Sequence, residues 1–163
     1  MRHEMLAPTV GDEVVQMAIQ MEETGRDFYE AVGSATTDPE IIKLCQRLAA
    51  EESNHREVFR KIRSELARQG ETIFLRDDQI AEARRAAKES ILPNRETIYK
   101  VVTTGNVADL LAVAIQMERD AIRFYSGIAE NIPDRTAVEV IIQEEQGHLR
   151  VLSAASDRTK TNA

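Results

Sequence analysis

The sequence predicts an all-α protein, a four-helix bundle with a long crossover between the second and third helices. Apolar residues recur at helical spacing in four long stretches, and no run shows the strict alternation of a strand. The 163 residues include only 7 glycines and 4 prolines, a composition that permits long helices. The connection between the second and third stretches spans residues 71–105, far more than two antiparallel neighbours need.

The first two helices are predicted from the residues at their ends. The first begins near Thr9 or Asp12, both competent N-caps, and ends at Gly33. The second begins at Asp38–Pro39, a cap followed by proline at the first helical position. It runs to about Gln69–Gly70, where glycine is a common helix terminator.

The last two helices are predicted in the same way. The third begins at about Asn106 and runs to about Asn131, before Pro133. Asp134 caps the fourth, which we expect to end after Ala155 in the polar tail SDRTKTNA.

The crossover divides the chain into two helix pairs. Within it, AEARRAAKESIL predicts a short helix that ends before Pro93. Helix pair, crossover and helix pair form the ferritin-like arrangement of the four-helix bundle. We expect one domain over residues 1–163, with tails at 1–10 and 156–163.

Composition excludes several classes of function. The net charge of −7 argues against a nucleic-acid partner, because it would add to the repulsion from the phosphates. No apolar run is long enough to span a membrane, and the N-terminus MRHEMLAPTV is too polar for a secretory signal. The single cysteine, Cys45, excludes an internal disulfide and is expected in the core, whereas His3 is expected in the tail. These features favour a reduced, cytoplasmic location with no membrane partner.

One pattern of twelve residues occurs twice, as AIQMEETGRDFY at 18–29 and AIQMERDAIRFY at 114–125. Both copies lie in a broad apolar helical stripe. Each copy places one glutamate inside that stripe, Glu22 in the first and Glu118 in the second.

The second and fourth helices carry a second repeat. The apolar heptad seam of the second helix contains Glu52 and His55, and that of the fourth contains Glu145 and His148. The E-x-x-H spacing puts a carboxylate and an imidazole on one helical face. The two repeats together predict a pseudo-two-fold axis on which these six polar side chains meet.

Charge makes such a cluster a candidate metal site. Carboxylates ~5 Å apart repel by roughly 3 kcal/mol per pair at an effective dielectric constant of about 20. No Lys or Arg lies in the stripes, whereas two divalent cations would balance four carboxylates. Oxygen-rich ligation with one imidazole per ion favours two iron ions, with manganese or zinc as substitutes, and the lack of thiolates argues against structural zinc. This constellation is known from di-iron carboxylate bundles.

The stretches AIQMEETGRDFY, EESNH, AIQMERDAIRFY and EEQGH resemble the rubrerythrin branch of the ferritin-like superfamily. The resemblance covers the four helices, and it implies a homodimer. It also implies tyrosines near the metals, Tyr29 and its repeat mate Tyr125, able to bond a ligand carboxylate. It implies six ligands, namely two terminal carboxylates, two bridging carboxylates and one imidazole on each iron: Glu22 and Glu118, Glu52 and Glu145, His55 and His148.

Two departures from this family limit what the resemblance implies. Rubrerythrins proper carry a rubredoxin-like tail with CxxC pairs, which this chain lacks. They also have an extra glutamate for peroxide chemistry three residues before the third-helix ligand, where this chain has Ile115. Peroxidase activity therefore does not follow, and electrons have to come from an external donor or from Fe(II) itself.

Glu51 and Glu144 leave a question about the ligands open. Each lies four residues before a histidine, so helical geometry alone does not exclude either as a ligand. The heptad seam and the family pattern favour Glu52 and Glu145. On that reading, Glu51 and Glu144 are charges outside the ligand set.

The function expected from these patterns is redox chemistry at a di-iron centre that reacts with dioxygen or peroxide. One alternative is iron handling or storage. A second is a di-iron hydroxylase, against which the charged crossover RDDQIAEARRAAKES argues, because a greasy substrate needs an apolar surface. A third is a metal-binding sensor or structural bundle without catalysis.

Overall fold

The computed structural model describes residues 10–70, 75–81, 85, 95–104 and 106–161, and within them the chain is helical with no strand. The helices are α1 (Val10–Ala35), α2 (Pro39–Gln69), α4 (Arg95–Thr104), α5 (Val107–Ile128), the short 3₁₀ helix η1 (Ala129–Asn131) and α6 (Arg135–Thr161). The predicted all-α fold is therefore confirmed.

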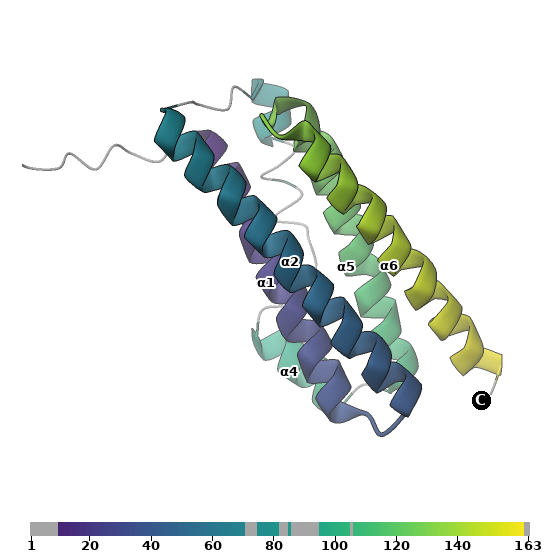
Figure 1. The fold of residues 1–163 in the computed structure, drawn as a ribbon. Helices are drawn as coiled ribbons and strands as arrows, with labels where there is room; N and C mark the ends of the chain where they lie inside the picture. The colour runs from purple at the N-terminus through teal and green to yellow at the C-terminus, as the bar shows by residue number, and fades with distance from the viewer. Residues whose placement is uncertain (1–9, 71–74, 82–84, 86–94, 105, 162–163) are drawn as a thin grey trace, which may run out of the picture.

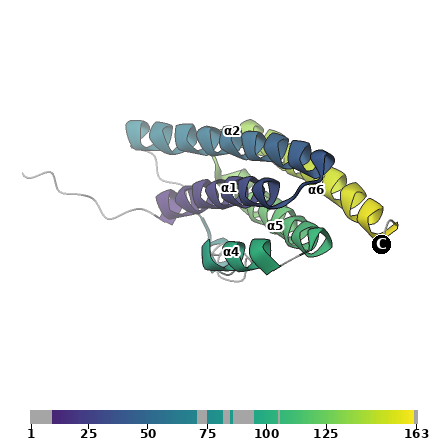
Figure 2. The same ribbon diagram turned by 90° about the horizontal axis from the view of Figure 1, so that it is seen from below.

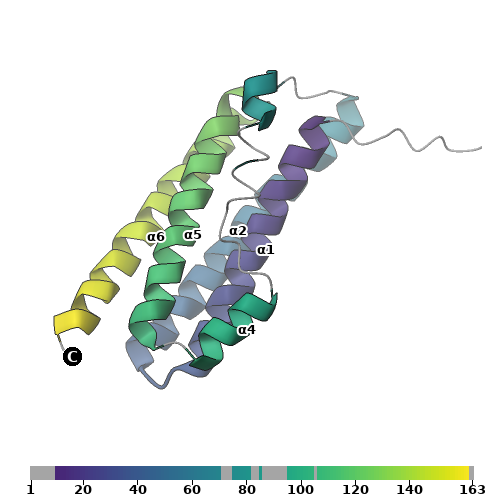
Figure 3. The ribbon, with the colours of Figure 1, turned by 180° about the vertical axis from the view of Figure 1, so that it is seen from behind.

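Two antiparallel hairpins, α1 with α2 and α5 with α6, make up the bundle (Figure 1). Helix α2 ends at one end of the bundle, whereas α4 leads into α5 at the other, so the connection crosses the length of the bundle. Seen from behind, α1 and α5 lie side by side, and contacts join them (Figure 3). This is the ferritin-like arrangement that the sequence predicts.

The predicted caps of α2 and α5 are present. The side chain of Asp38 accepts hydrogen bonds from the backbone N–H groups of Glu40 and Ile41. Gly70 ends α2 in the left-handed conformation, with φ of 64°, which glycine adopts without steric cost. At the start of α5, the side chain of Asn106 accepts from the N–H of Asp109.

The predicted end of the fourth helix is wrong. Helix α6 continues six residues past Ala155, to Thr161, so residues 156–161 are not a frayed tail. Ser156, the first residue of this extension, is buried at 6% exposure. Residues 162–163 lie outside the described part of the chain, as do residues 1–9 with His3.

The crossover contains a helix that the sequence analysis did not predict. Helix α4 lies against α1 and α5, on the side away from α2 and α6 (Figure 2). Its Ile98 is buried and belongs to one of the apolar clusters of the core. Most of the stretch predicted as a helix, residues 81–92, lies outside the described residues.

Two apolar clusters fill the bundle, one toward each end. The first takes residues from the start of α1, the end of α2 and the turn between α5 and α6, such as Val15 and Phe59. The second takes residues from the opposite ends of the same helices, such as Phe28 and Leu48. Cys45 lies in this second cluster as expected, and burial raises its pKa to about 11, so the thiol stays protonated.

Candidate metal centre

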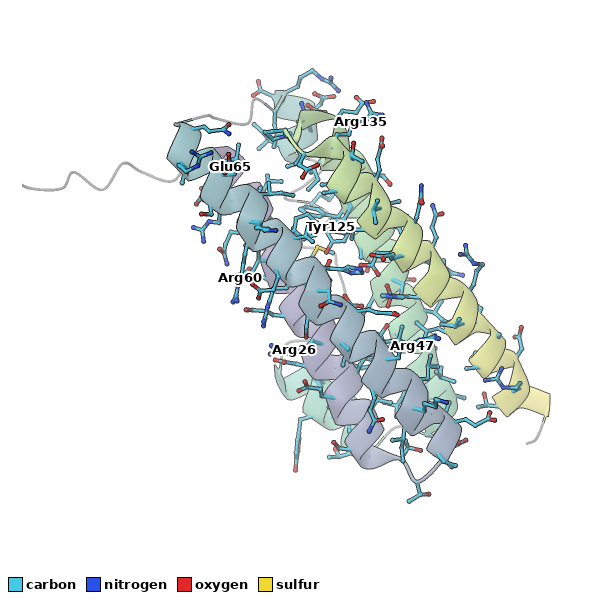
Figure 4. The ribbon with its side chains drawn as sticks, viewed as in Figure 1. Arg26, Arg47, Arg60, Glu65, Tyr125 and Arg135 are labelled. Atoms are coloured by element: carbon cyan, nitrogen blue, oxygen red, sulfur yellow. The ribbon has the colours of Figure 1, made fainter. Side chains whose placement is uncertain are left out.

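The six predicted site residues meet between the two apolar clusters. They come from four helices and are all at least 96% buried: Glu22 on α1, Glu52 and His55 on α2, Glu118 on α5, and Glu145 and His148 on α6. Among the described residues no Lys or Arg is buried, so no fixed cation neutralises the four carboxylates. Figure 4 shows the contrast, because Tyr125 lies inside the bundle whereas Arg60 and Arg135 project from its surface.

The six side chains form two overlapping groups. Glu22 and His55 make up one group together with Glu52 and Glu145, and Glu118 and His148 complete the other with the same two glutamates. Within each group, ligand-type atoms lie within 4.8 Å of one another. Two carboxylates shared by two groups are the arrangement that bridging ligands require. The order of groups follows the sequence repeat, with terminal glutamate and histidine from the same half of the chain.

Unpartnered atoms inside the cluster test whether a metal fits. Five buried side-chain atoms make no hydrogen bond of acceptable geometry, although Nδ1 of each histidine lies close to Glu145: Oε2 of Glu22, both carboxylate oxygens of Glu145, and Nδ1 of His55 and of His148. A buried polar atom without a partner costs free energy, and here all five belong to the two groups. Cations bound between these atoms would satisfy them. The donor set of oxygens and imidazole nitrogens therefore fits metal ions.

Burial also shapes the pKa values of the cluster. Burial, and then repulsion from Glu52, raises the pKa of Glu22 well above its usual value. Burial and the charge of Glu145 do the same to the pKa of Glu118. Burial alone would lower the pKa of His55, but the carboxylates of Glu145, Glu22 and Glu52 around its Nδ1 atom outweigh that effect and raise the pKa. Glu22, Glu118 and His55 therefore bind protons readily, and a metal ion that binds to these side chains must displace those protons.

His148 and the two shared glutamates complete this pattern. Burial lowers the pKa of His148, but the surrounding carboxylates, Glu118 first among them, raise it overall. For Glu145, burial raises the pKa and the two histidines outweigh that effect, so the pKa falls below its usual range. The pKa of Glu52 also falls, because hydrogen bonds outweigh burial and the charge of Glu145.

Glu51 and Glu144 lie outside both groups and bond the outer faces of the histidines. Nε2 of His55 lies 2.9 Å from Glu144, and Nε2 of His148 lies 2.9 Å from Glu51. An ionised carboxylate only accepts hydrogen bonds, so each Nε2 carries the hydrogen. The other nitrogen, Nδ1, then faces the cluster, as a metal-binding imidazole requires. Each contact joins α2 to α6, a pairing that the repeat alone did not reveal.

The two tyrosines also bond across the repeat. The hydroxyl of Tyr29 donates to Glu118, and the hydroxyl of Tyr125 donates to Glu22. Burial, and then the charge of the facing glutamate, raises the pKa of both phenols, so both keep their protons. The sequence analysis expected a tyrosine near a ligand carboxylate. The structure adds that each tyrosine meets the glutamate of the opposite half.

Gly25 is a site residue that the sequence analysis did not single out. It lines a cavity of about 20 Å³ between α1 and α5, together with Glu52 and three pairs of repeat mates. A Cβ atom at Gly25 would lie 3.3 Å from Cδ of Glu52, which is closer than most real Cβ contacts. The sequence repeat contains a signal for this residue, because the repeat mate of Gly25 is Ala121. Glycine inside a helix destabilises the helix by roughly 0.5–1 kcal/mol relative to alanine, so a glycine at one copy of the repeat indicates a special requirement there.

Ile115 occupies the position of the extra glutamate of rubrerythrins. It is partly buried and packs against the second apolar cluster. The side chain of Ile115 therefore has an apolar environment.

None of the helices among the described residues is long and apolar enough to cross a membrane.

The chain matches the family model described as rubrerythrin over residues 13–156, a range that includes all six residues of the cluster. Comparisons with curated proteins and with solved structures give no significant match.

Proposed function

The chain belongs to the rubrerythrin family, and we propose that it is a di-iron oxidoreductase that reacts with dioxygen or peroxide. The observation that carries this proposal is the pair of overlapping ligand groups, in which five buried polar atoms make no hydrogen bond of acceptable geometry. A purely structural cluster of this kind would leave those atoms unsatisfied at a cost in stability.

In this proposal each iron has a terminal glutamate and a histidine of its own. Glu22 and His55 would hold one ion, Glu118 and His148 would hold the other, and the shared glutamates would bridge them. Bound iron supplies Lewis acidity and electrons for the reduction of the oxidant. Manganese and zinc suit a similar donor set and are possible substitutes for iron.

The surrounding residues support the ligands and restrict what reaches them. Glu51 and Glu144 fix the orientation of the imidazoles, and the tyrosines hold the terminal carboxylates. The cavity of about 20 Å³ has room for a molecule of about the size of water. This small volume favours a small oxidant over an organic substrate, and so disfavours the hydroxylase alternative.

The reduction of an oxidant requires a source of electrons. We propose that the electrons come from an external donor or from the oxidation of Fe(II) itself. Ile115 stands where rubrerythrins carry the glutamate used in peroxide chemistry, so we propose dioxygen as well as peroxide as the oxidant. The homodimer, the cytoplasmic location and the single domain stay predictions from the sequence.

Anaerobic loading with Fe(II), followed by air or hydrogen peroxide, tests this function. We expect two irons per chain after desalting, and loss of Fe(II), measured with ferrozine, faster than in buffer. A chain that retains only traces of iron would refute the proposal. Uptake of many irons per chain would favour storage instead, and two bound irons that oxidise no faster than aqueous iron would favour a sensor.

A further inference from the structure

The two shared glutamates are equivalent in the sequence repeat but not in the structure. The oxygens of Glu145 lie 3.0 Å from Nδ1 of His55 and 2.9 Å from Nδ1 of His148. The corresponding distances from Glu52 are 3.8 Å and 3.4 Å. Glu145 is thus held closely between both imidazoles, whereas Glu52 stands further from each.

The cavity lies on the side of Glu52. Its lining consists of repeat mates in pairs: Met21 and Met117, Glu22 and Glu118, Gly25 and Ala121, Tyr29 and Tyr125. Glu52 is the exception, because its repeat mate Glu145 is not among the described residues that line the cavity. Of the two shared carboxylates, Glu52 is therefore the one that borders this cavity among the residues that the structure describes.

Gly25 is what leaves room beside Glu52. A Cβ atom there would lie 3.3 Å from Cδ and 3.4 Å from Cγ of Glu52, so the carboxylate would have to shift by a few tenths of an ångström. Gly25 is itself buried in the middle of α1, where alanine favours the helix more than glycine does. The other copy of the repeat has alanine at this position, so the helix pattern does not require glycine.

We infer that Gly25 is a positioning residue that keeps Glu52 free to change its position at the metal centre, while Glu145 stays fixed. This inference rests on the proposed function, since it concerns the carboxylates that would bridge the two metal ions. The different mobility of Glu52 and Glu145 makes the two halves of this nearly symmetric site inequivalent. The carboxylate that can move, that of Glu52, is the one that borders the cavity, where a small oxidant would approach.

The chain supplies its own matched control for a test of this inference. Gly25→Ala adds a methyl group beside Glu52, and Ala121→Gly removes one from the equivalent position. The probe is Co(II), whose binding is followed by its visible absorption. We expect Gly25→Ala to weaken Co(II) binding by about tenfold, the lower end of the effect of residues that orient ligands. We expect Ala121→Gly to change it less than about twofold, because no carboxylate has to move.

Two results would overturn the inference. One is Co(II) binding to Gly25→Ala with wild-type affinity, and the other is an equal loss in Ala121→Gly, which would indicate a general sensitivity of helix packing. Circular dichroism checks that both variants are folded. A wild-type chain that binds no Co(II) would overturn this inference and the proposed function together. A wild-type chain that binds Co(II) but does not accelerate Fe(II) oxidation would refute the proposed function alone.

A second measurement needs no variant. Crystal structures of the unmutated chain, without metal and with Co(II), should show a larger displacement of the carboxylate of Glu52 than of Glu145. Equal displacements of the two carboxylates would contradict the inference, even if Gly25→Ala failed to fold.

Discussion

Glu145→Gln is the change expected to damage the site most, because Glu145 belongs to both ligand groups. The side chain is 1% exposed, and its two oxygens face the Nδ1 atoms of His55 and His148 at 3.0 Å and 2.9 Å. Glutamine keeps the shape of the side chain but removes its charge and one acceptor oxygen. The substitution therefore tests the charge of Glu145 rather than its volume.

The expected loss can be bounded from the structure. Residues that only orient a ligand contribute about 10–100-fold to metal affinity, so a shared ligand should contribute more than about 100-fold for each ion. That is more than about 2.7 kcal/mol per ion. In the metal-free chain, the two buried imidazoles also lose their shared partner. Breaking a buried ion pair costs about 3–5 kcal/mol, so we expect unfolding to require about 3 kcal/mol less.

Glu51→Gln is the matched control. Glu51 precedes Glu52, but its side chain is 41% exposed and contacts only Nε2 of His148 in the cluster. Glutamine keeps an oxygen that accepts from this Nε2. We therefore expect both irons to remain bound, with affinity reduced about tenfold or less, and a change in the free energy of unfolding below about 1 kcal/mol.

Iron per chain, measured after anaerobic Fe(II) loading and desalting, separates the two variants, and urea unfolding of the metal-free proteins gives their stabilities. Wild type and Glu51→Gln should keep two irons, and Glu145→Gln should keep none. The ligand assignment is wrong if folded Glu145→Gln keeps both irons, or if Glu51→Gln loses them as completely as Glu145→Gln does.

Further predictions concern protons, the tyrosines and the apolar side of the site. Because the pKa values of Glu22 and His55 are raised, these groups hold protons that a metal must displace. Iron affinity should therefore fall as the pH is lowered from about 8 to about 6. Calorimetry of metal binding in buffers of different ionisation enthalpy should detect the protons that are released. Tyr29→Phe leaves a buried oxygen of Glu118 without its hydrogen-bond donor, and Tyr125→Phe does the same to Glu22. Each substitution should lower the free energy of unfolding, measured with urea, by about 1–2 kcal/mol. No change in either variant would contradict the tyrosine–glutamate hydrogen bonds between the two halves of the chain. Ile115→Glu should increase the ratio of peroxide to dioxygen rates, and an unchanged ratio would show that this position does not limit peroxide reactivity.

The helix ends show how far local sequence determines the fold. Asp38, Gly70 and Asn106 were predicted as caps and act as caps, because capping depends on hydrogen bonds within a few residues of the chain. The end of α6 was predicted too early, because SDRTKT is polar but contains no glycine or proline to stop a helix. The helix continues through this segment, in which Ser156 is buried, and no local pattern reports that burial.

The sequence by itself determined which six side chains meet, because helical periodicity and two internal repeats put them on inward faces at the same level of the bundle. Only the tertiary structure decided which atoms face one another. Glu51 meets His148, and Tyr29 meets Glu118, although the two residues are 97 apart in the first pair and 89 apart in the second, and lie on different hairpins. The different surroundings of Glu52 and Glu145 likewise follow from packing between helices. A periodic pattern gives the face on which a residue lies, but the neighbour across that face depends on how the two hairpins dock.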